Sequence, residues 1–574
     1  MKTWTCDVLV IGSGAAGIAA ALRAAHDGNS VIVAEKDRYL GGTTAISGGW
    51  LWVPGNEQGV REGDTREEAE AYIRHLAGDS YDAAAVGAFL DTVPEAMRFF
   101  TDEAGIAFHY PEKAPDYQMD APGAKVSGRA VTVGATDARM LGEDRLRMQP
   151  YLQSYTVFGY MPEVGPDIAQ FLRANRDPAA FRHAARKIAT TWVQTLLHRR
   201  ALVRTNGNAL MTRMVAAARE AGIRMWTSSP VTEILHGPDG TVTGARLSGA
   251  HAGTVHARLG VVVASGGFSG DADLRRRYFP HDPDGDDHTT PTVGHDGDAV
   301  RLTAPLGGHV DDRPHQPASW GPVTVFRGLR GNRRWFPHLR AFGLPGLIAV
   351  DRDGVRFANE SSSYHDFGVE MIRNDAGRDG TYGWIVADDT AMRRYGIGWA
   401  KPWPFPQALF RRAGYLHSAP TVAALAGRIG VPAAALQRTL DEFNAGAARG
   451  EDPRFGRGSN WFHHFKGDLE HRPNPNLAPI EKGPFHAVRI EMGDLGTYAG
   501  LAVGPGHEVL DDDARPVPGL YAVGTAAVSV FGGGYPGYGA NIGPAMVSGY
   551  RVGRDIAARA GERAPRADAG AVAF

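Results

Sequence analysis

The stretch DVLVIGSGAAG, residues 7–17, decides the fold of the chain. Its four consecutive apolar residues are typical of a strand that is buried on both faces of a parallel sheet, and a glycine turn follows at once. Residues 18–25 predict a helix, and a second apolar run, residues 31–34, is followed by an acid, Glu35. Strand, glycine turn, helix, strand and acid together predict a βαβ unit that binds a dinucleotide.

The glycines of this turn, Gly12, Gly14 and Gly17, each have a physical task. They allow the tight turn, the close approach of the backbone to a pyrophosphate, and close packing of the helix on the strand. The pyrophosphate is expected at the helix N-terminus, where free N–H groups and the positive end of the helix dipole favour an anion. Glu35 is expected to accept hydrogen bonds from the adenosine ribose.

Length and charge exclude several classes of protein. The chain has 574 residues, enough for two to four structural units at roughly 150 residues each. With 61 Lys+Arg against 63 Asp+Glu its formal net charge is −2, so no overall field attracts nucleic acid or an anionic membrane. The single cysteine, Cys6, excludes an intramolecular disulfide, a Cys-ligated zinc site and an iron–sulfur cluster.

The N-terminus and the apolar runs bear on localisation. Residues 2–21 loosely imitate a secretory signal, but Asp7 and three glycines interrupt the apolar run, so the strand, turn and helix explain these residues better. No run of 18 or more apolar residues predicts a transmembrane helix. The lone cysteine fits a reducing compartment. We therefore expect a soluble, cytoplasmic protein.

The sequence after the second strand indicates which dinucleotide is bound. Residues 41–50, GGTTAISGGW, resemble the second flavin-contacting loop of the FAD enzyme superfamily that includes fumarate reductase and 3-ketosteroid Δ1-dehydrogenase. Three further regions resemble segments of the same superfamily: residues 206–232, residues 261–268, and the pair 519–524 and 539–545. The resemblance covers nearly the whole chain and implies FAD. Covalent members carry a histidine in the loop matched by residues 41–50, which contain none, so non-covalent FAD is implied.

The glycine turn and the resemblance together define the candidate FAD-binding residues. They are Gly12, Gly14, Ala16, Gly17, Glu35, Lys36, Gly42, Thr43, Thr44, Ser47, Gly48, Gly49, Val231, Ala264, Gly266, Gly524, Asn541 and Ile542.

The resemblance also implies the domain organisation. It predicts an α/β fold in which a Rossmann-type FAD-binding domain is interrupted by an inserted α+β catalytic domain, the cap, which covers the isoalloxazine. The expected FAD-binding parts are residues 1–278 and 489–562, the cap is residues 279–488, and residues 563–574 are a flexible tail.

Two motifs supply the candidate catalytic residues. Residues 351–367, DRDGVRFANESSSYHDF, resemble a superfamily element that projects an arginine over the flavin in fumarate reductase-like members and a tyrosine in ketosteroid dehydrogenase-like members; Tyr364 matches the tyrosine. Residues 534–543, GYPGYGANIG, are similar to the ketosteroid dehydrogenase motif whose tyrosine hydroxyl and glycine N–H bind the substrate carbonyl, matched by Tyr535 and Gly539. Tyr117 matches a third family tyrosine, which hydrogen-bonds the base.

The resemblance implies α,β-dehydrogenation, a 1,2-desaturation, of a cyclic ketone. Tyr535 and the Gly539 N–H would polarise the carbonyl, because loss of an α-proton builds an enolate whose oxygen needs preorganised donors. Tyr364, assisted by Tyr117, would take that proton, and the β-hydrogen would leave as hydride to flavin N5. The implied substrates are apolar cyclic ketones: a 3-ketosteroid, or a smaller alicyclic ketone such as cyclohexanone or 4-oxocyclohexanecarboxylate. The acceptor that reoxidises the flavin stays open between a quinone-like molecule, an electron-transfer protein and O2.

Two other functions are weighed against desaturation. A fumarate reductase-like ene-reductase acting on an unsaturated acid needs histidine and arginine near the flavin, but residues 494–501 contain no histidine and residues 524–550 no arginine. A flavoprotein whose cofactor is structural or serves a partner would bind FAD without reacting with a ketone.

Several features leave the substrate and site open. Residues 130–200 and 313–346 differ from what a steroid dehydrogenase leads us to expect, which puts the steroid in doubt, and Tyr155, Tyr160 or Tyr498 could join the catalytic set. No metal site is expected: residues 281–288 contain metal-ligand residue types, but Asp287 stands where a calcium loop needs glycine. The arginine-rich residues 327–340 are interpreted as a surface or lid segment that could instead meet an acceptor or a substrate carboxylate.

Overall fold

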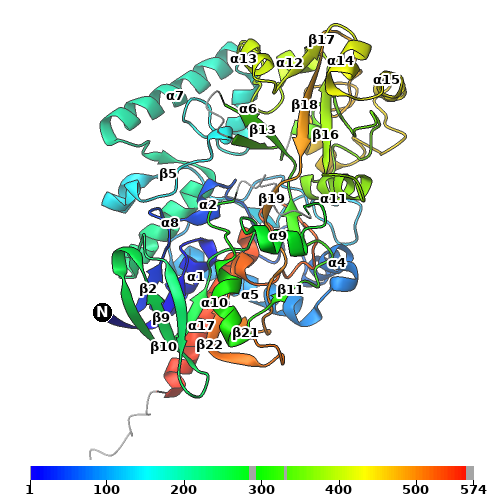
Figure 1. The fold of residues 1–574 in the computed structure, drawn as a ribbon. Helices are drawn as coiled ribbons and strands as arrows, with labels where there is room; N and C mark the ends of the chain where they lie inside the picture. Colours follow the sequence, from blue (N-terminus) through cyan, green and yellow to red (C-terminus); the bar gives the residue numbers. More distant parts are fainter. Residues whose placement is uncertain (1, 283–291, 329–332, 340, 564–574) are drawn as a thin grey trace, which may run out of the picture.

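The computed structural model describes residues 2–282, 292–328, 333–339 and 341–563. Figure 1 shows a lower part built around the N-terminal strand and an upper part built around a second sheet. The expected tail, residues 563–574, lies almost entirely outside the described residues.

The lower sheet contains the two strands predicted from residues 7–34. Its strands run in the order β21-β22-β10-β1-β2-β7, and β9, which pairs with β10 and β8, extends it. β1 pairs in parallel with β2 and β10, β10 pairs in parallel with β22, and β2 in parallel with β7. The bounds are β1 (Lys2–Ile11), β2 (Val31–Ala34), β7 (Arg224–Trp226), β8 (Val231–His236), β9 (Val242–Leu247), β10 (Gly253–Val263), β21 (Glu508–Leu510) and β22 (Pro516–Ala522).

Burial on both faces explains the unbroken apolar run of β1. Val8 and Val10 belong to a core that includes helices α1 (Ala15–His26), α8 (Asn206–Glu220) and α17 (Ile542–Arg563). Leu9 and Ile11 belong to a second core, on the other face, with residues of β9 and β10. A strand covered on both sides has no polar face, so its sequence does not alternate.

The upper sheet is antiparallel, and most of its residues belong to the segment expected as the cap, residues 279–488. Its order is β14-β13-β18-β16-β15, and β17 also pairs with β18. Helix α11 (Tyr364–Asn374) connects β15 to β16, and helices α14 (Val422–Ile429) and α15 (Ala433–Ala447) cover one face of the sheet. The strands are β13 (Val323–Arg327), β14 (Arg333–Pro337), β15 (Leu347–Val350), β16 (Tyr382–Ala387), β17 (His417–Ala419) and β18 (Phe485–Glu491).

The remaining helices and strands complete the described fold. The remaining α-helices are α2 (Gly42–Ile46), α3 (Glu57–Arg61), α4 (Arg66–Ala77), α5 (Ala83–Arg98), α6 (Pro166–Arg173), α7 (Pro178–His198), α9 (Ala272–Tyr278), α10 (Asp298–Thr303), α12 (Asp389–Arg394), α13 (Ala408–Arg412) and α16 (Trp461–Lys466). The short strands pair as β3 (Leu51–Trp52) with β4 (Ala130–Val131), β5 (Thr136–Asp137) with β6 (Val203–Arg204), β11 (Val310–Asp311) with β20 (Gly500–Leu501), and β12 (Ala318–Trp320) with β19 (Asp494–Thr497).

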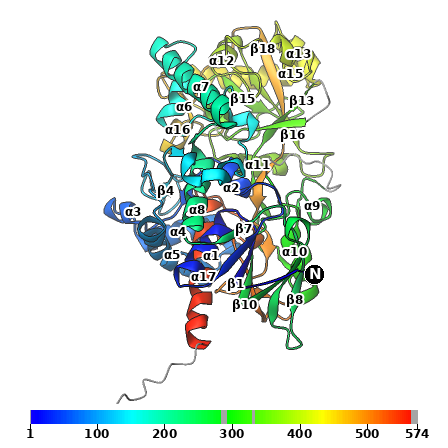
Figure 2. The same cartoon turned by 90° about the vertical axis from the view of Figure 1, so that its left-hand side faces the viewer.

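The structure differs from the expected domain boundaries in three places. Helix α10, expected in the cap, packs on the lower sheet because Ala299 is buried among residues of that core. The expected boundary at residue 488 falls inside β18, which continues to Glu491. Helices α6 and α7, expected in the FAD-binding part, lie beside the upper sheet in both views (Figures 1 and 2), where Arg173 pairs with Glu470 at 3.0 Å.

None of the helices in the described ranges combines the length and the hydrophobicity that crossing a bilayer requires.

A buried cluster of charges holds the segment that leads into α11. Arg356 pairs with Glu360 at 2.6 Å and with Asp452 at 2.8 Å, and all three side chains are at least 97% buried. Arg457 pairs with Glu360 at 3.2 Å and donates to the Leu347 carbonyl oxygen. The cluster therefore ties residues 356–360 to the far side of the cap, four residues before Tyr364.

Removing one member of this cluster should destabilise the protein strongly. Arg356→Met leaves the buried carboxylates of Glu360 and Asp452 without their main partner, which costs about 3–5 kcal/mol. We expect the midpoint of thermal unfolding, followed by circular dichroism, to fall by several degrees. Arg373→Met is the matched control, because Arg373 pairs with Glu370 while 71% exposed. Equal midpoints for the two variants would contradict the assigned role of the cluster.

Candidate active site

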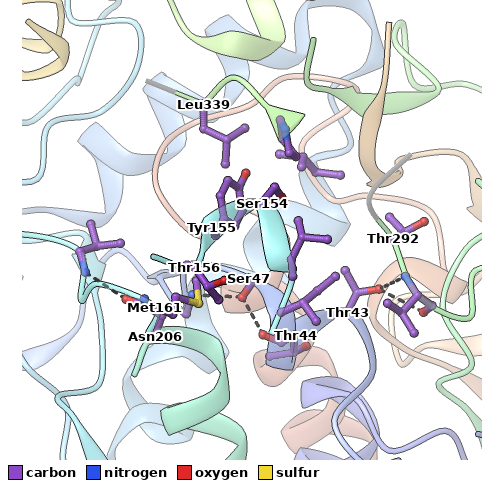
Figure 3. Close-up of a pocket in the computed structure, with 18 of the residues that line it drawn as sticks. Thr43, Thr44, Ser47, Ser154, Tyr155, Thr156, Met161, Asn206, Thr292 and Leu339 are labelled. Atoms are coloured by element: carbon purple, nitrogen blue, oxygen red, sulfur yellow. Dashed lines mark hydrogen bonds between the residues drawn. The ribbon is translucent and has the colours of Figure 1, made fainter. Parts of the chain in front are cut away.

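One cavity of about 1920 Å³ connects the glycine turn of the lower sheet with the cap. Figure 3 shows part of its lining: Thr43, Thr44 and Ser47 lie on one side, and Tyr155 and Leu339 lie on the other. The volume exceeds that of an ordinary small-molecule pocket, about 300–1000 Å³, so it has room for a dinucleotide and a substrate together.

The glycine turn fits a dinucleotide. Gly12 has φ +107°, and a Cβ there would lie 2.4 Å from the Ala264 carbonyl oxygen, so no other residue fits. Gly14 caps helix α1 and provides no side-chain hydrogen bond to its first turn, which leaves amides for a pyrophosphate. Gly17 does not line the cavity; a Cβ there would lie 2.1 Å from the Gly12 carbonyl oxygen, which matches its expected packing task.

Glu35 supports the turn directly. One carboxylate oxygen accepts hydrogen bonds from the Ser13 N–H (3.0 Å) and hydroxyl (2.7 Å), and the other accepts from the Asp37 N–H at 2.9 Å. A carboxylate has about four lone-pair sites, so Glu35 retains capacity for ribose hydroxyls. Lys36 lines the cavity and pairs with Asp296 (2.7 Å) and Asp298 (2.6 Å).

The structure brings the predicted FAD-binding residues together. All of them except Gly17 line the cavity: Gly12, Gly14, Ala16, Glu35, Lys36, Gly42, Thr43, Thr44, Ser47, Gly48, Gly49, Val231, Ala264, Gly266, Gly524, Asn541 and Ile542. Sequence reasoning missed the segment 292–298, whose Val293 exchanges hydrogen bonds with the Thr43 hydroxyl at 2.9 and 3.1 Å. No motif marks this segment, which lies inside the range expected as the cap, although its Asp296 and Asp298 side chains pair with Lys36.

Three tyrosines that are far apart in sequence meet in the cavity. The Tyr117 hydroxyl donates a hydrogen bond to the Tyr364 hydroxyl at 3.1 Å. The Tyr117 ring stacks on Tyr535 with centroids 5.4 Å apart, and Tyr364 lies edge-on to Tyr535 at 5.1 Å. All three are at least 95% buried and line the cavity.

The position of Tyr364 in its helix favours a phenolate, and its burial opposes one. Tyr364 is the first residue of α11, after the N-cap Ser363, whose hydroxyl accepts a hydrogen bond from the Asp366 N–H. Negative charge is stabilised at this end of a helix. Burial nevertheless raises the pKa of Tyr364 well above 10. Burial also raises the pKa of Tyr535, to about 12.

The loop around Tyr535 offers a second donor. Gly539 has φ +91°, and a Cβ there would lie 2.3 Å from the Trp50 carbonyl carbon. The Gly539 carbonyl oxygen accepts from the Trp52 N–H at 3.2 Å. Among the described residues, no acceptor binds the Gly539 N–H, and Gly539 lines the cavity beside Tyr535. A tyrosine hydroxyl and a free amide on one loop provide two donors for a carbonyl oxygen.

Buried ion pairs fix the segment that carries Tyr117. Its neighbour Asp116 accepts from the Trp52 indole N–H and from Arg129, each at 2.8 Å. Arg129 also pairs with Asp64 at 2.7 Å, and the arginine and both acids are at least 98% buried. This network sets the position of Tyr117 without touching the cavity.

The three tyrosines left open by the sequence have different surroundings. Tyr155 lines the cavity, and its buried hydroxyl has no partner among the described residues. Tyr160 donates to Asp167 at 2.8 Å and does not line the cavity. Tyr498 lies behind Tyr535, with ring centroids 6.4 Å apart, and also does not line it. Only Tyr155 of these three is placed to meet a substrate.

Two other segments considered in the sequence lie only partly within the described residues. Of residues 281–288, His281 and Asp282 are described, and Asp282 pairs with Arg275 at 2.6 Å. Of the arginine-rich residues 327–340, Arg330 and Arg340 lie outside the described residues, and Arg333 and Arg334 are exposed and do not line the cavity.

Comparisons with known proteins agree with this geometry. Residues 7–542 match the model of the FAD binding domain family. The chain is 60% identical to 4-oxocyclohex-2-ene-1-carboxylate 5-dehydrogenase of Sinomonas cyclohexanicum, over 98% of this chain and 95% of the relative. It is 34% identical to 4-oxocyclohexanecarboxylate 2-dehydrogenase of the same organism, over 97% and 93% of the two chains. The structure of 3-ketosteroid Δ1-dehydrogenase from Sterolibacterium denitrificans with 1,4-androstadiene-3,17-dione matches with a TM-score of 0.88 at 31% identity, over 97% of this chain and 100% of that one.

The close approach at Gly12 predicts the effect of a single methyl group. Gly12→Ala places a Cβ against the Ala264 carbonyl oxygen, so the turn must shift and FAD binding should be lost. The measurement is the ratio of flavin to protein absorbance in the purified variant. Gly28→Ala is the matched control, since Gly28 also has positive φ (+83°) but nothing lies within 4 Å of an added Cβ. Retention of FAD by Gly12→Ala would show that the close approach is not required.

Proposed function

The chain belongs to the FAD-binding family that contains the ketosteroid dehydrogenase-like desaturases, as its sequence predicts, and on this premise we propose that it desaturates a carboxylated cyclohexenone beside its carbonyl. The general reaction, FAD-dependent dehydrogenation of a cyclic ketone, follows from the family. The family relationship also favours this reaction over the fumarate reductase-like alternative.

The observation that carries the proposal is the buried Tyr117–Tyr364 hydrogen bond next to Tyr535 and the free Gly539 N–H. A base beside two donors suits removal of a proton α to a carbonyl, because the donors stabilise the enolate oxygen as the base takes the proton. These groups come from three different segments, and all of them line the cavity.

Each group has a proposed role. Tyr535 and the Gly539 N–H hold the carbonyl oxygen, which fixes the ring and acidifies its α-carbon. Tyr364 removes the α-proton, and the hydrogen bond from Tyr117 stabilises the resulting negative charge on Tyr364 when it acts as phenolate. When bound, FAD supplies the acceptor for the hydride that leaves the β-carbon.

We further propose that FAD is held without a covalent bond, because residues 41–50 contain no histidine. Denaturing the protein with acid should then release all of the flavin into the supernatant. Flavin that remains with the precipitated protein would contradict this.

The proposed substrate is 4-oxocyclohex-2-ene-1-carboxylate, by similarity to the relative of that specificity at 60% identity. Loss of a proton from C5 and a hydride from C6 gives 4-oxocyclohexa-2,5-diene-1-carboxylate. Movement of the C1 hydrogen to the carbonyl oxygen converts this dienone to 4-hydroxybenzoate without a further oxidant. The aromatic product makes the overall reaction strongly favourable.

The experiment that tests the function is turnover by the FAD-loaded enzyme with an artificial dye as electron acceptor. We expect 4-hydroxybenzoate to form from 4-oxocyclohex-2-ene-1-carboxylate, with far lower rates for 4-oxocyclohexanecarboxylate and 4-androstene-3,17-dione. A higher rate with the steroid would overturn the proposed substrate. Failure to oxidise all three, with reoxidation of the chemically reduced enzyme by fumarate, would overturn desaturation.

Replacing the proposed base should remove most of the activity. Tyr364→Phe keeps the ring and deletes the hydroxyl, and we expect kcat to fall by about 10²–10⁴-fold, the usual contribution of a general base. Tyr382→Phe is the control, because Tyr382 lies in β16 and does not line the cavity. A loss below about tenfold in Tyr364→Phe would exclude Tyr364 as the base.

The pH dependence follows from the same residue. The pKa of Tyr364 is raised by burial, so the active phenolate is a minor species near neutrality and its fraction grows as pH rises. We expect kcat/KM to increase continuously from about pH 7 to about pH 9, below a phenol pKa of about 10 or more. A profile that is flat across this range would contradict a tyrosine base.

A further inference from the structure

The cavity holds a positive charge that has no counter-ion among the residues the structure describes. Lys401 lies between α12 and α13 and lines the cavity on the cap side. No carboxylate of the described residues pairs with its ammonium group. Its environment is apolar, and burial alone lowers the pKa of Lys401 to about 8. An ammonium group in such a place is costly unless a bound anion compensates it.

A second polar group in the same wall also lacks a partner. The Tyr155 hydroxyl is buried and no described residue binds it. Tyr155 and the proposed carbonyl donor Tyr535 line the same cavity. A buried hydroxyl without a partner is unfavourable, and a hydrogen bond to a ligand would remove that cost.

One aromatic ring connects these two groups. The Lys401 Nζ lies 4.5 Å from the centre of the Phe336 ring, and Tyr155 lies edge-on to the same ring, with centroids 6.1 Å apart. Phe336 itself lines the cavity. The cation and the hydroxyl therefore lie around one apolar side chain, in a wall that also extends toward Tyr535.

Nearby charged side chains neither pair with Lys401 nor add to its charge. Asp468 is bound by Arg394 and by the Tyr395 hydroxyl, at 2.7 Å for the latter. His338 packs against Phe336 and also lines the cavity, but burial lowers its pKa to about 3, so it is neutral and adds no positive charge. Lys401 is thus the cation that an anionic substrate would meet in this part of the cavity.

We propose that Lys401 and Tyr155 form the subsite for the ring carboxylate of the substrate. This inference rests on the proposed function, which places the carbonyl at Tyr535 and Gly539. The carbonyl and the carboxylate occupy positions 4 and 1 of the six-membered ring, so they point in opposite directions. A carbonyl held by one wall directs the carboxylate away from it, and an ammonium group with a hydroxyl donor is suited to receive a carboxylate.

The subsite gives the enzyme a means to discriminate among ketones. A neutral ketone leaves the Lys401 charge and the Tyr155 hydroxyl uncompensated, whereas a carboxylated ketone satisfies both. Specificity of this kind, in which the wrong ligand leaves buried polar groups unpaired, is stronger than discrimination by apolar contacts alone.

The test compares two ketones that differ only in the carboxylate: 4-oxocyclohex-2-ene-1-carboxylate and cyclohex-2-enone, which yield 4-hydroxybenzoate and phenol. In Lys401→Met we expect the ratio of kcat/KM for the carboxylated ketone to that for the neutral ketone to fall by about 10- to 100-fold, mainly through KM of the carboxylated ketone. Tyr155→Phe, which changes one atom and preserves the ring, should lower the same ratio by about 3- to 10-fold.

Lys113→Met is the matched control. The Lys113 ammonium also lies over an aromatic ring, 4.2 Å from the centre of Trp461, but Lys113 is exposed and does not line the cavity. The Lys113→Met variant removes one positive charge and one cation–π contact at the surface. Its ratio of kcat/KM for the two ketones should therefore equal that of the unmodified enzyme.

The outcomes separate this inference from the proposed function. If the unmodified enzyme oxidises neither ketone, the proposed function fails. If it oxidises the carboxylated ketone but Lys401→Met and Tyr155→Phe lower kcat/KM for both ketones equally, desaturation stands and the carboxylate subsite is wrong. A fall in the ratio for both variants, and not for Lys113→Met, supports the subsite.

Discussion

The carbonyl oxygen of Pro536 is the point on which the active site depends. It accepts hydrogen bonds from the Tyr117 N–H at 2.9 Å and from the Tyr72 hydroxyl at 2.8 Å, and thereby joins segments more than 400 residues apart. Tyr535 precedes this residue and Gly539 follows it, so the loop proposed to bind a carbonyl is fixed to the segment that carries Tyr117. Because Tyr117 in turn donates to Tyr364 of the cap, one backbone oxygen sets the geometry between the two parts of the molecule.

Burial creates both the difficulty and the specificity of this site. Water does not solvate the three buried tyrosines, and burial raises the pKa of each. A phenolate at Tyr364 is therefore unfavourable until it is compensated by the hydrogen bond from Tyr117 and by the N-terminal end of α11. The same low-polarity surroundings strengthen the hydrogen bonds that Tyr535 and Gly539 offer to an enolate oxygen. A base of this kind works only when all of its neighbours are in place, which is why buried ion pairs hold both Tyr117 and the segment before α11.

The sequence predicted the parts of the structure in which backbone constraints leave a pattern. Gly12 and Glu35 stand at fixed places in a βαβ unit, which makes them identifiable from spacing. Gly539 is identified through the resemblance of residues 534–543 to a family motif, and the structure shows that it has positive φ. Segment 292–298 was not identified, because no motif marks it and the resemblance places it in the cap, although its Asp296 and Asp298 side chains pair with Lys36. Helix α10 lies inside the range that the resemblance implies for the cap, and its apolar residues do not indicate which of the two cores they join. The pairing of Tyr117 with Tyr364 came from the resemblance alone, since no spacing predicts a contact across 247 residues.

The substrate end of the cavity was the least predictable part, and its chemistry explains why. Lys401, Tyr155 and Phe336 come from three separate segments, and each residue type is ordinary in its own sequence context. Only the structure shows what sets them apart. Within the described residues, the Tyr155 hydroxyl has no hydrogen-bond partner and the Lys401 ammonium group has no counter-ion. Protein interiors rarely leave such groups unsatisfied, because the cost falls directly on stability. Where two of them line the same cavity as a reactive centre, the missing partner is most simply the substrate itself, and its charge can be inferred from theirs.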